Sequence, residues 1–163
     1  MVKAAIITVS DKGSKGQRID ETGQMLRSYL EENGYEIKYY TVIPDEEDHI
    51  EVELKYISDV LQFPLIVTNG GTGFAKRDIT PEVTFKVIDK YVPGIGEIMR
   101  MKNLQKTERS ILSRGICGIR KNSLIVNLPG SPKGAKENLE CVLPTLKHGI
   151  DILTGDAFEC ARK

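Results

Sequence analysis

Two glycine-bearing segments have the residue types and order needed to bind an anion. Each runs from an apolar strand pattern through an asparagine into a glycine turn and then a helix start: LIVTNGGTG at Leu65–Gly73 and LIVNLPGSPKG at Leu124–Gly134. Glycine lets backbone N–H groups approach a ligand closely, and the N-terminus of the following helix adds partial positive charge. Neither segment has the Gly-Lys-Ser/Thr ending of a nucleotide-hydrolysing P-loop. The pattern therefore predicts a phosphate site of another kind.

A plainer interpretation is that each segment only connects a strand tightly to a helix. For either segment alone, both interpretations stay open. The repetition of the pattern favours a ligand with separated phosphates, and so do the basic residues nearby, Lys76, Arg77 and Lys133.

Two aspartates follow predicted strands and can converge on the same sheet edge as the glycine turns. Asp45 lies at the helix start IPDEED, and Asp78 lies in RDITPE. Carboxylates repel phosphates unless a Mg²⁺ ion lies between them, so the pair predicts a magnesium site. Two alternatives stay open: Asp45 as the N-cap of its helix, and Asp78 as an exposed acid paired with Arg77.

A third polar segment follows the first predicted strand. Ser10 and Asp11 end that strand, and Asp20, Thr22 and Gly23 lie further along. Such residues can bind hydroxyl or amide groups of a ligand, but on their own they more often only turn the chain.

Strand and helix patterns alternate along the chain. Apolar runs predict strands at Lys3–Ser10, Glu36–Val42, Pro64–Thr68, Gly115–Arg120 and Ser123–Leu128, with the last two paired as a hairpin. Helices are predicted around residues 25–33, after Asp45, from a Thr80 cap to about Tyr91, over Gly96–Leu104 and in segments around Pro144, with a loop at Asp11–Asp20. This alternation predicts an α/β fold with a mostly parallel, mixed sheet. Ligands of such sheets bind beyond the carboxyl ends of the strands, where both glycine turns fall.

The composition limits the class of protein. With 163 residues and 40% apolar content, residues 1–163 are expected to form a single domain. Lys+Arg and Asp+Glu are equal at 23 each, so no bulk positive field favours nucleic acid as a partner. Short apolar runs predict neither a membrane span nor a signal peptide. Cys117, Cys141 and Cys160 have no zinc or redox spacing, which predicts a reduced, cytoplasmic protein with thiols that fill the core.

Six motifs together resemble the molybdopterin adenylyltransferases of molybdenum cofactor biosynthesis, a family that includes bacterial enzymes and domains of gephyrin and its plant counterpart. They follow in order over essentially the whole chain: ITVSD (7–11), IPDE (43–46), NGGTGFAKRDITPE (69–82), PGIGE (93–97), LSRGICGIR (112–120) and NLPGSPKGAKE (127–137). The resemblance implies a three-layer α/β/α domain that binds molybdopterin and is commonly a homotrimer. It also implies transfer of AMP from Mg²⁺-ATP to the terminal phosphate of molybdopterin, release of pyrophosphate, and hand-over to a molybdate-inserting protein.

The resemblance and the residue chemistry together assign roles to the candidate residues. Asp45 and Asp78 are expected to hold Mg²⁺ and to act in catalysis, and Asp45 is present where some members of a sister branch lack it. The remaining candidates are Gly70, Gly71, Thr72, Gly73 and Arg77 for the nucleotide phosphates, and Ser10, Asp11, Ser113, Pro129, Gly130 and Ser131 for the pterin or its phosphate.

A phosphate monoester has a second pKa of about 6, so such a nucleophile is largely ionised near neutral pH and needs no general base. Two other functions remain as hypotheses. The protein could bind or carry molybdopterin without transferring AMP, or it could be a nucleotide-binding regulator of another pathway.

Overall fold

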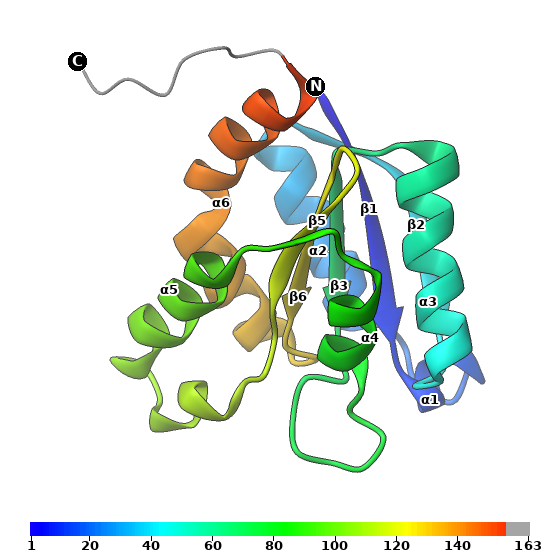
Figure 1. The fold of residues 1–163 in the computed structure, drawn as a ribbon. Helices are drawn as coiled ribbons and strands as arrows, with labels where there is room; N and C mark the ends of the chain where they lie inside the picture. The colour runs from blue at the N-terminus through cyan, green and yellow to red at the C-terminus, as the bar shows by residue number, and fades with distance from the viewer. Residues whose placement is uncertain (156–163) are drawn as a thin grey trace.

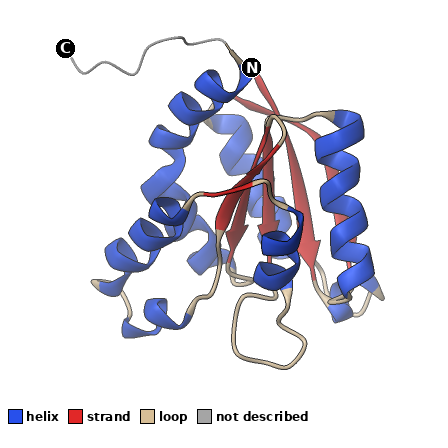
Figure 2. Ribbon diagram, in the orientation of Figure 1, coloured by secondary structure: helices blue, strands red, loops and turns tan. Residues whose placement is uncertain are grey.

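The structure is a computed structural model, and it describes residues 1–155. A six-stranded sheet with the order β2-β1-β3-β6-β5-β4 lies between two layers of helices (Figures 1 and 2). β2, β1, β3 and β6 run parallel, whereas β5 is antiparallel to β6 and β4 is antiparallel to β5. The strands are β1 (Val2–Val9), β2 (Tyr35–Ile43), β3 (Leu65–Asn69), β4 (Lys90–Tyr91), β5 (Cys117–Arg120) and β6 (Ser123–Leu128). The predicted three-layer α/β fold with a mostly parallel, mixed sheet is confirmed.

The inner strand β1, between β2 and β3, supplies side chains to both hydrophobic cores. Ala4 and Ile6 pack on one face of the sheet, Ala5 and Ile7 pack on the other, and all four are fully buried. A parallel strand covered on both faces needs such a continuous apolar run. The first face is covered by α2 (Glu21–Glu32), α5 (Pro93–Leu104) and α6 (Pro132–Thr154), and the second by α3 (Glu47–Lys55), the π-helical turn η1 (Tyr56–Leu61) and α4 (Thr80–Val87).

The strand order changes direction beside β1, because β2 lies on one side of it and β3 on the other. The helix α2 connects β1 to β2, and α3 belongs to the connection from β2 to β3. These two helices lie on opposite faces of the sheet. Such a switch point leaves a crevice at the carboxyl ends of the strands. In Figure 1 the arrowhead of β1, the short helix α1 (Asp11–Ser14) and the loop between β3 and α4 all lie at this lower end.

Two predicted boundaries are wrong because backbone contacts decide them. The predicted loop at Asp11–Asp20 contains α1, which Ser10 caps by accepting a hydrogen bond from the N–H of Gly13 at 3.1 Å. The helix expected to reach Tyr91 ends at Val87 instead. The chain then joins the sheet as β4, where the N–H of Asp89 donates to the carbonyl of Ile119 at 2.7 Å.

Other helix starts also differ from the predictions. Thr80 is the first residue of α4 and Ile79 takes the cap position, because Thr80 is fully buried against the preceding loop. α5 begins at Pro93, earlier than the predicted Gly96. The segments predicted around Pro144 form one continuous helix, α6, which is capped by the hydroxyl of Ser131.

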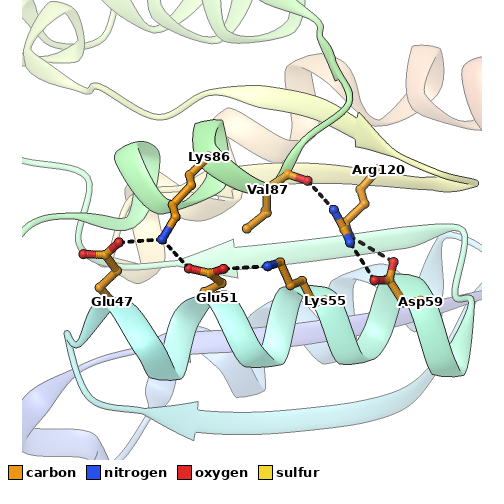
Figure 3. Close-up of polar contacts among 7 residues, drawn as sticks. All are labelled: Glu47, Glu51, Lys55, Asp59, Lys86, Val87 and Arg120. Carbon is orange, nitrogen blue, oxygen red and sulfur yellow. Dashed lines mark hydrogen bonds and ion pairs between the residues drawn. The ribbon is translucent and has the colours of Figure 1, made fainter.

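Charged side chains join the helical layer at α3 and α4 to the edge of the sheet (Figure 3). Lys86 of α4 pairs with Glu47 at 3.0 Å and with Glu51 at 2.7 Å, both on α3. Glu51 also pairs with Lys55 one turn further on, at 2.6 Å. A second group begins at Arg120 of β5, which forms two bonds to Asp59, at 3.0 and 2.6 Å, and donates to the carbonyl of Val87 at 2.8 Å.

The structure bears on two expectations from the sequence, the state of the cysteines and the lack of a membrane span. Cys117 is buried and Cys141 half-buried, and both are free thiols, while Cys160 lies outside the described residues. Residues 1–155 contain no helix whose length and apolar character would suit a bilayer crossing.

Glu51 is expected to make stability depend on pH. Its two lysine partners lower the pKa of Glu51 from 4.5 to about 2, so its contribution is complete above about pH 4.5 and is lost as the pH falls toward 2. In urea unfolding, Glu51→Gln should therefore be less stable than the wild type at pH 6 to 7, and the difference should shrink on acidification. The exposed Glu97→Gln on α5 is the control, and a difference that stays constant down to pH 3 would contradict the assignment.

Candidate functional site

A cleft of about 820 Å³ opens at the carboxyl ends of β1, β3 and β6. It lies at the switch point between β1 and β3, where the fold predicts a ligand. Its lining includes these residues of the predicted site: Ser10, Asp45, Gly70, Gly71, Asp78, Gly130 and Ser131. The fold therefore brings parts of all three predicted polar segments together at one cavity.

The first glycine turn requires glycine for two reasons. Gly70 and Gly71 have φ angles of +99° and +64°, which other residues adopt at a cost. A Cβ on Gly70 would overlap the carbonyl oxygen of Val9, and one on Gly71 would overlap the hydroxyl of Thr80. The turn therefore has to pass directly over the end of β1.

The N–H groups of this turn differ in what they can bind. The N–H of Gly70 donates to the carbonyl of Leu128 at 3.1 Å, so it is already used within the protein. The N–H groups of Gly71, Thr72 and Gly73 have no hydrogen-bond acceptor among residues 1–155. Of these three residues, Gly71 also lines the cleft, so the turn brings an N–H that no described residue uses to the cavity.

The second glycine turn lies directly against the first. A Cβ on Gly130 would lie 3.3 Å from the Cα of Gly70. The carbonyl of Gly130 accepts a hydrogen bond from the hydroxyl of Thr22 at 2.7 Å, which ties this turn to α2. Ser131 uses its hydroxyl to cap α6 by accepting from the N–H of Gly134 at 3.2 Å. Ser131 thus fixes the N-terminus of α6 at the cleft, where the helix dipole favours an anion.

Asp45 is held by a reciprocal pair of hydrogen bonds and does not cap α3. Its carboxylate accepts from the N–H of Asp11 at 2.9 Å, and its own N–H donates to the Asp11 carboxylate at 3.1 Å. Glu46 takes the N-cap position of α3. Burial raises the pKa of the Asp45 carboxyl above its usual value, and the neighbouring charges of Asp11 and Asp78 raise it further. A cation bound beside Asp45 would favour the charged carboxylate and so lower this pKa.

Asp78 and Arg77 do not pair with each other. Asp78 accepts a hydrogen bond from the N–H of Ala75 at 2.9 Å. Arg77 instead pairs with Asp11 at 2.6 Å and with Glu46 at 2.6 Å. The alternative in which Asp78 serves Arg77 is therefore wrong. The acids use Nε and Nη2 of Arg77.

Two carboxylates and one hydroxyl make this end of the cleft suitable for a hard cation. Asp45 and Asp78 both line the cleft, and residues 1–155 contain no cluster of three or more acidic, histidine or cysteine ligands. The hydroxyl of Thr80 is fully buried without a hydrogen-bond partner in the described part of the chain, on the side of Gly71 that also faces Asp45. Mg²⁺ usually takes one or two carboxylates and completes its shell with water and phosphate oxygens, so this donor set fits it.

The other predicted residues do not line the cleft: Asp11, Thr72, Gly73, Arg77, Ser113 and Pro129. Sequence reasoning missed the residue that connects several of them. The N–H of Arg114 donates to the carbonyl of Thr72 at 3.0 Å, and its guanidinium donates to the carbonyls of Gly73 at 2.8 Å and Asp78 at 2.6 Å. Arg114 also pairs with Glu82 of α4. Arg114 thus braces the glycine turn, and its only signal in the sequence was the LSR motif that drew attention to Ser113.

The lining also includes residues of the third polar segment, for which the sequence leaves a ligand contact and a simple turn both open. Asp20, the N-cap of α2, lines the cleft with Arg18 and Thr22, and the strand residues Thr8 and Asn69 line it as well. A polar loop carries no local signal that separates a turn from a binding surface, so only the fold could place these residues at the site.

The fold and the cleft define an α/β protein with glycine turns and acidic residues at a switch point. The family profile described as "Probable molybdopterin binding domain" matches residues 5–148, and the chain belongs to this family. Its curated relatives include the molybdopterin adenylyltransferase of Helicobacter pylori strain 26695, with 43% identity over 99% of this chain and 93% of that protein. The enzyme of the same name from Escherichia coli K12 is 40% identical over 91% of this chain and 80% of that protein.

Solved structures confirm the same relationship. The molybdopterin biosynthesis enzyme MoaB from Thermus thermophilus superposes with a TM-score of 0.91 at 46% identity, over 98% of this chain and 100% of that chain. The Mog protein from Mycobacterium ulcerans superposes with a TM-score of 0.87 at 35% identity, over 94% of this chain and 99% of that chain. The predicted family is thereby confirmed.

The close approach at Gly70 predicts a large stability difference between two matched variants. Gly34 has a similar φ of +86° but no atom within 4 Å of an added Cβ, whereas a Cβ on Gly70 meets the Val9 backbone. Gly70→Ala should therefore lower the free energy of unfolding by about 1–3 kcal/mol more than Gly34→Ala, because overpacking adds to the shared backbone strain. Chemical denaturation measures both, and equal losses would show that the turn can move away from β1.

Proposed function

We propose that this protein is a molybdopterin adenylyltransferase. It transfers AMP from Mg²⁺-ATP to the terminal phosphate of molybdopterin, giving adenylyl-molybdopterin and pyrophosphate. The observation that supports this most strongly is that the two glycine turns and the pair Asp45 and Asp78 border one cleft, in a chain whose near full-length relatives bear this enzyme's name.

The reaction needs positioning and charge stabilisation more than acid–base chemistry. The terminal phosphate of molybdopterin attacks the α-phosphorus of ATP, and the bond from that phosphorus to the oxygen of the leaving pyrophosphate breaks. Because the attacking monoester is largely ionised near neutral pH, no side chain has to remove a proton. The barrier is the approach of one anion to another, which fixed N–H donors and cations lower.

Residues of the cleft and of the segments that continue from it divide this work. The N–H of Gly71, which lines the cleft, and those of Thr72 and Gly73, which follow it, hold the nucleotide phosphates together with the guanidinium of Arg77. The turn at Pro129–Ser131 and the N-terminus of α6 hold the phosphate of the pterin. Ser10, Asp11 and Ser113 have supporting roles at the rim.

Asp45 and Asp78 would hold Mg²⁺ beside these phosphates. When bound, this ion supplies positive charge that offsets the repulsion between the two substrates. Asp11 keeps the Asp45 carboxylate in place through its N–H, and Arg114 keeps the loop that carries Asp78 in place through the Asp78 carbonyl.

The second candidate function is a carrier that binds molybdopterin without transferring AMP. The presence of both aspartates in the cleft favours the enzyme, because a carrier has no need for a cation beside the phosphates. Incubation with molybdopterin and Mg²⁺-ATP distinguishes the two, since the carrier would bind the pterin and give no adenylylated product.

Asp45→Asn and Asp78→Asn should each lower Mg²⁺-dependent AMP transfer by at least about tenfold, because each removes a charged metal ligand. The measurement is the rate of pyrophosphate release, with folding checked by circular dichroism. Asp48→Asn, an exposed aspartate in the first turn of α3, makes the same charge change outside the cleft and should keep wild-type activity. If Asp45→Asn and Asp78→Asn both kept full activity, the assignment of these aspartates as catalytic metal ligands would be wrong.

We further propose that residues 1–163 form one domain that assembles as a homotrimer and passes its product to a molybdate-inserting protein in the cytoplasm. α5 and the neighbouring turn η2 (Glu108–Leu112) expose large apolar side chains that an assembly would cover: Met101, Leu104, Ile111 and Leu112. Sedimentation should give about three times the chain mass of 18.2 kDa, and Ile111→Glu should shift the protein toward smaller species. A monomeric wild type would contradict the trimer.

A further inference from the structure

Arg114 holds three carbonyl groups of the loop between β3 and α4. Its backbone N–H donates to the carbonyl of Thr72 at 3.0 Å. Its Nε donates to the carbonyl of Gly73 at 2.8 Å, and its Nη2 donates to the carbonyl of Asp78 at 2.6 Å. The remaining nitrogen, Nη1, pairs with Glu82. Every nitrogen of the guanidinium is therefore used within the protein, so Arg114 is placed to hold other groups and not to contact a phosphate itself.

The bonds to Thr72 and Gly73 fix the direction in which the turn presents its N–H groups. In a trans peptide unit the carbonyl and the following N–H point in opposite directions, and residues 1–155 contain no cis peptide bond. The N–H groups of Gly73 and Phe74 therefore point away from Arg114. Neither has a hydrogen-bond acceptor among the described residues. Arg114 thus binds the carbonyls of the turn and leaves these donors unused.

The bond to Asp78 ties the same guanidinium to a residue that lines the cleft. The carboxylate of Asp78 accepts from the N–H of Ala75 at 2.9 Å, and the N–H of Asp78 donates to the carbonyl of Ala75 at 2.9 Å. A Cβ on Gly73 would lie 2.8 Å from the same carboxylate. These contacts lie within the loop, so the loop could move as a unit without breaking them. Arg114 fixes this unit from outside, because its planar fork holds Gly73 and Asp78 together.

A second arginine holds the segment that carries Arg114. The Nη1 of Arg100, on α5, donates to the carbonyl of Gly115 at 3.0 Å and to that of Ser113 at 3.4 Å, the residues on either side of Arg114. Gly96 lies one turn earlier on α5 and makes room for this contact. A Cβ there would lie only 3.2 Å from both the guanidinium of Arg100 and the carbonyl oxygen of Gly115. The motifs around Gly96 and Arg114 thus meet at one contact.

Gly115 and Ile116 join this arrangement to the sheet. A Cβ on Gly115 would lie 2.9 Å from the carbonyl oxygen of Asn127 in β6, so the segment passes too close to the strand for a side chain. The N–H of Asn127 donates to the carbonyl of Ile116 at 3.0 Å. A continuous series of contacts therefore runs from β6, through Arg114, to the glycine turn and Asp78.

We propose that Arg100 and Arg114 are positioning residues for nucleotide binding. Arg114 sets the N–H groups of the glycine turn and the carboxylate of Asp78 relative to each other, and Arg100 acts through Arg114 by holding its segment beside β6. The inference rests on the proposed function for the identity of the ligand, Mg²⁺-ATP, whose phosphates and cation need both parts of the site at once. Groups that orient the ligands of a metal ion typically change its binding by about 10–100-fold when they are removed.

Arg114→Ala removes the guanidinium and keeps the backbone N–H that holds Thr72. Calorimetry with Mg²⁺ and α,β-methylene-ATP, an analogue that cannot transfer AMP, should show binding weakened by at least about tenfold. Guanidinium chloride at millimolar concentration should restore much of this affinity, because the free ion supplies the same planar donors, whereas methylammonium chloride should not. Arg27→Ala is the control: this exposed arginine of α2 pairs with Glu31, and the variant should bind the analogue as the wild type does.

Arg100→Ala tests the second step. It should weaken the same binding, and the double variant should bind no more weakly than Arg114→Ala alone, because Arg100 acts through Arg114. Additive losses would overturn the role of Arg100. Unchanged binding in Arg114→Ala, or a loss that guanidinium does not restore, would overturn the role of Arg114. If Arg114→Ala does not fold, Arg114→Lys should show the loss instead, since a single ammonium group lacks the fork that holds both carbonyls.

The readout is nucleotide binding and not AMP transfer, so the inference and the proposed function can fail separately. A wild type that binds the analogue but forms no adenylyl-molybdopterin from Mg²⁺-ATP would contradict the proposed function alone. Variants that bind the analogue as tightly as the wild type would contradict the inference alone. A wild type that binds no Mg²⁺-nucleotide would overturn both.

Discussion

The contact between Gly70 and the end of β1 is the constraint on which the cleft depends. The chain leaving β3 passes so close to the carbonyl of Val9 that no side chain fits between them. The N–H of Gly70 also bonds to Leu128, and Gly130 packs against the same turn. The ends of β1, β3 and β6 are therefore fixed relative to one another by backbone contacts. Groups carried on such strand ends keep their positions better than groups carried on long loops.

This constraint places acidic residues beside a site for anions, and the structure balances their charge unevenly. Arg77 pairs with Asp11 and lowers the pKa of that carboxyl through its hydrogen bonds. Asp45 lacks such a partner: its carboxylate accepts an N–H and lies among other negative charges, which together with burial raise its pKa. Asp45 and Asp78 thus line the cleft as carboxylates without an ion-pair partner among the described residues. A divalent cation is the simplest group that can satisfy both the carboxylates and the phosphates.

The parts of the fold that depend on local pattern could be predicted from the sequence. The apolar runs of β1, β3 and β6 predicted the buried strands, and the second glycine-bearing segment predicted a helix start, which the structure places at Pro132. β4 could not be found in this way, because Lys90 and Tyr91 are exposed and enter the sheet through backbone bonds alone. The same limit applies to the site. Glycine turns have a local signal, whereas Arg114 reaches Gly73 across 41 positions, and no spacing in the sequence indicates that contact.

The two asparagines in the near-repeated segments show why motif similarity does not settle function. Asn127 of β6 uses its whole amide within the protein: it donates to the hydroxyls of Thr68 and Thr84, and its oxygen accepts from the N–H of Ile116 at 3.3 Å. Asn69 of β3 lies one position further along in the sheet register, at the cleft, and its oxygen has no partner within the described chain. A fully bonded buried amide stabilises the fold, whereas a half-bonded one is unfavourable unless something else completes it. The repeated asparagine is therefore fully bonded within the protein in β6, whereas in β3 the same residue type keeps a buried oxygen without a partner among the described residues.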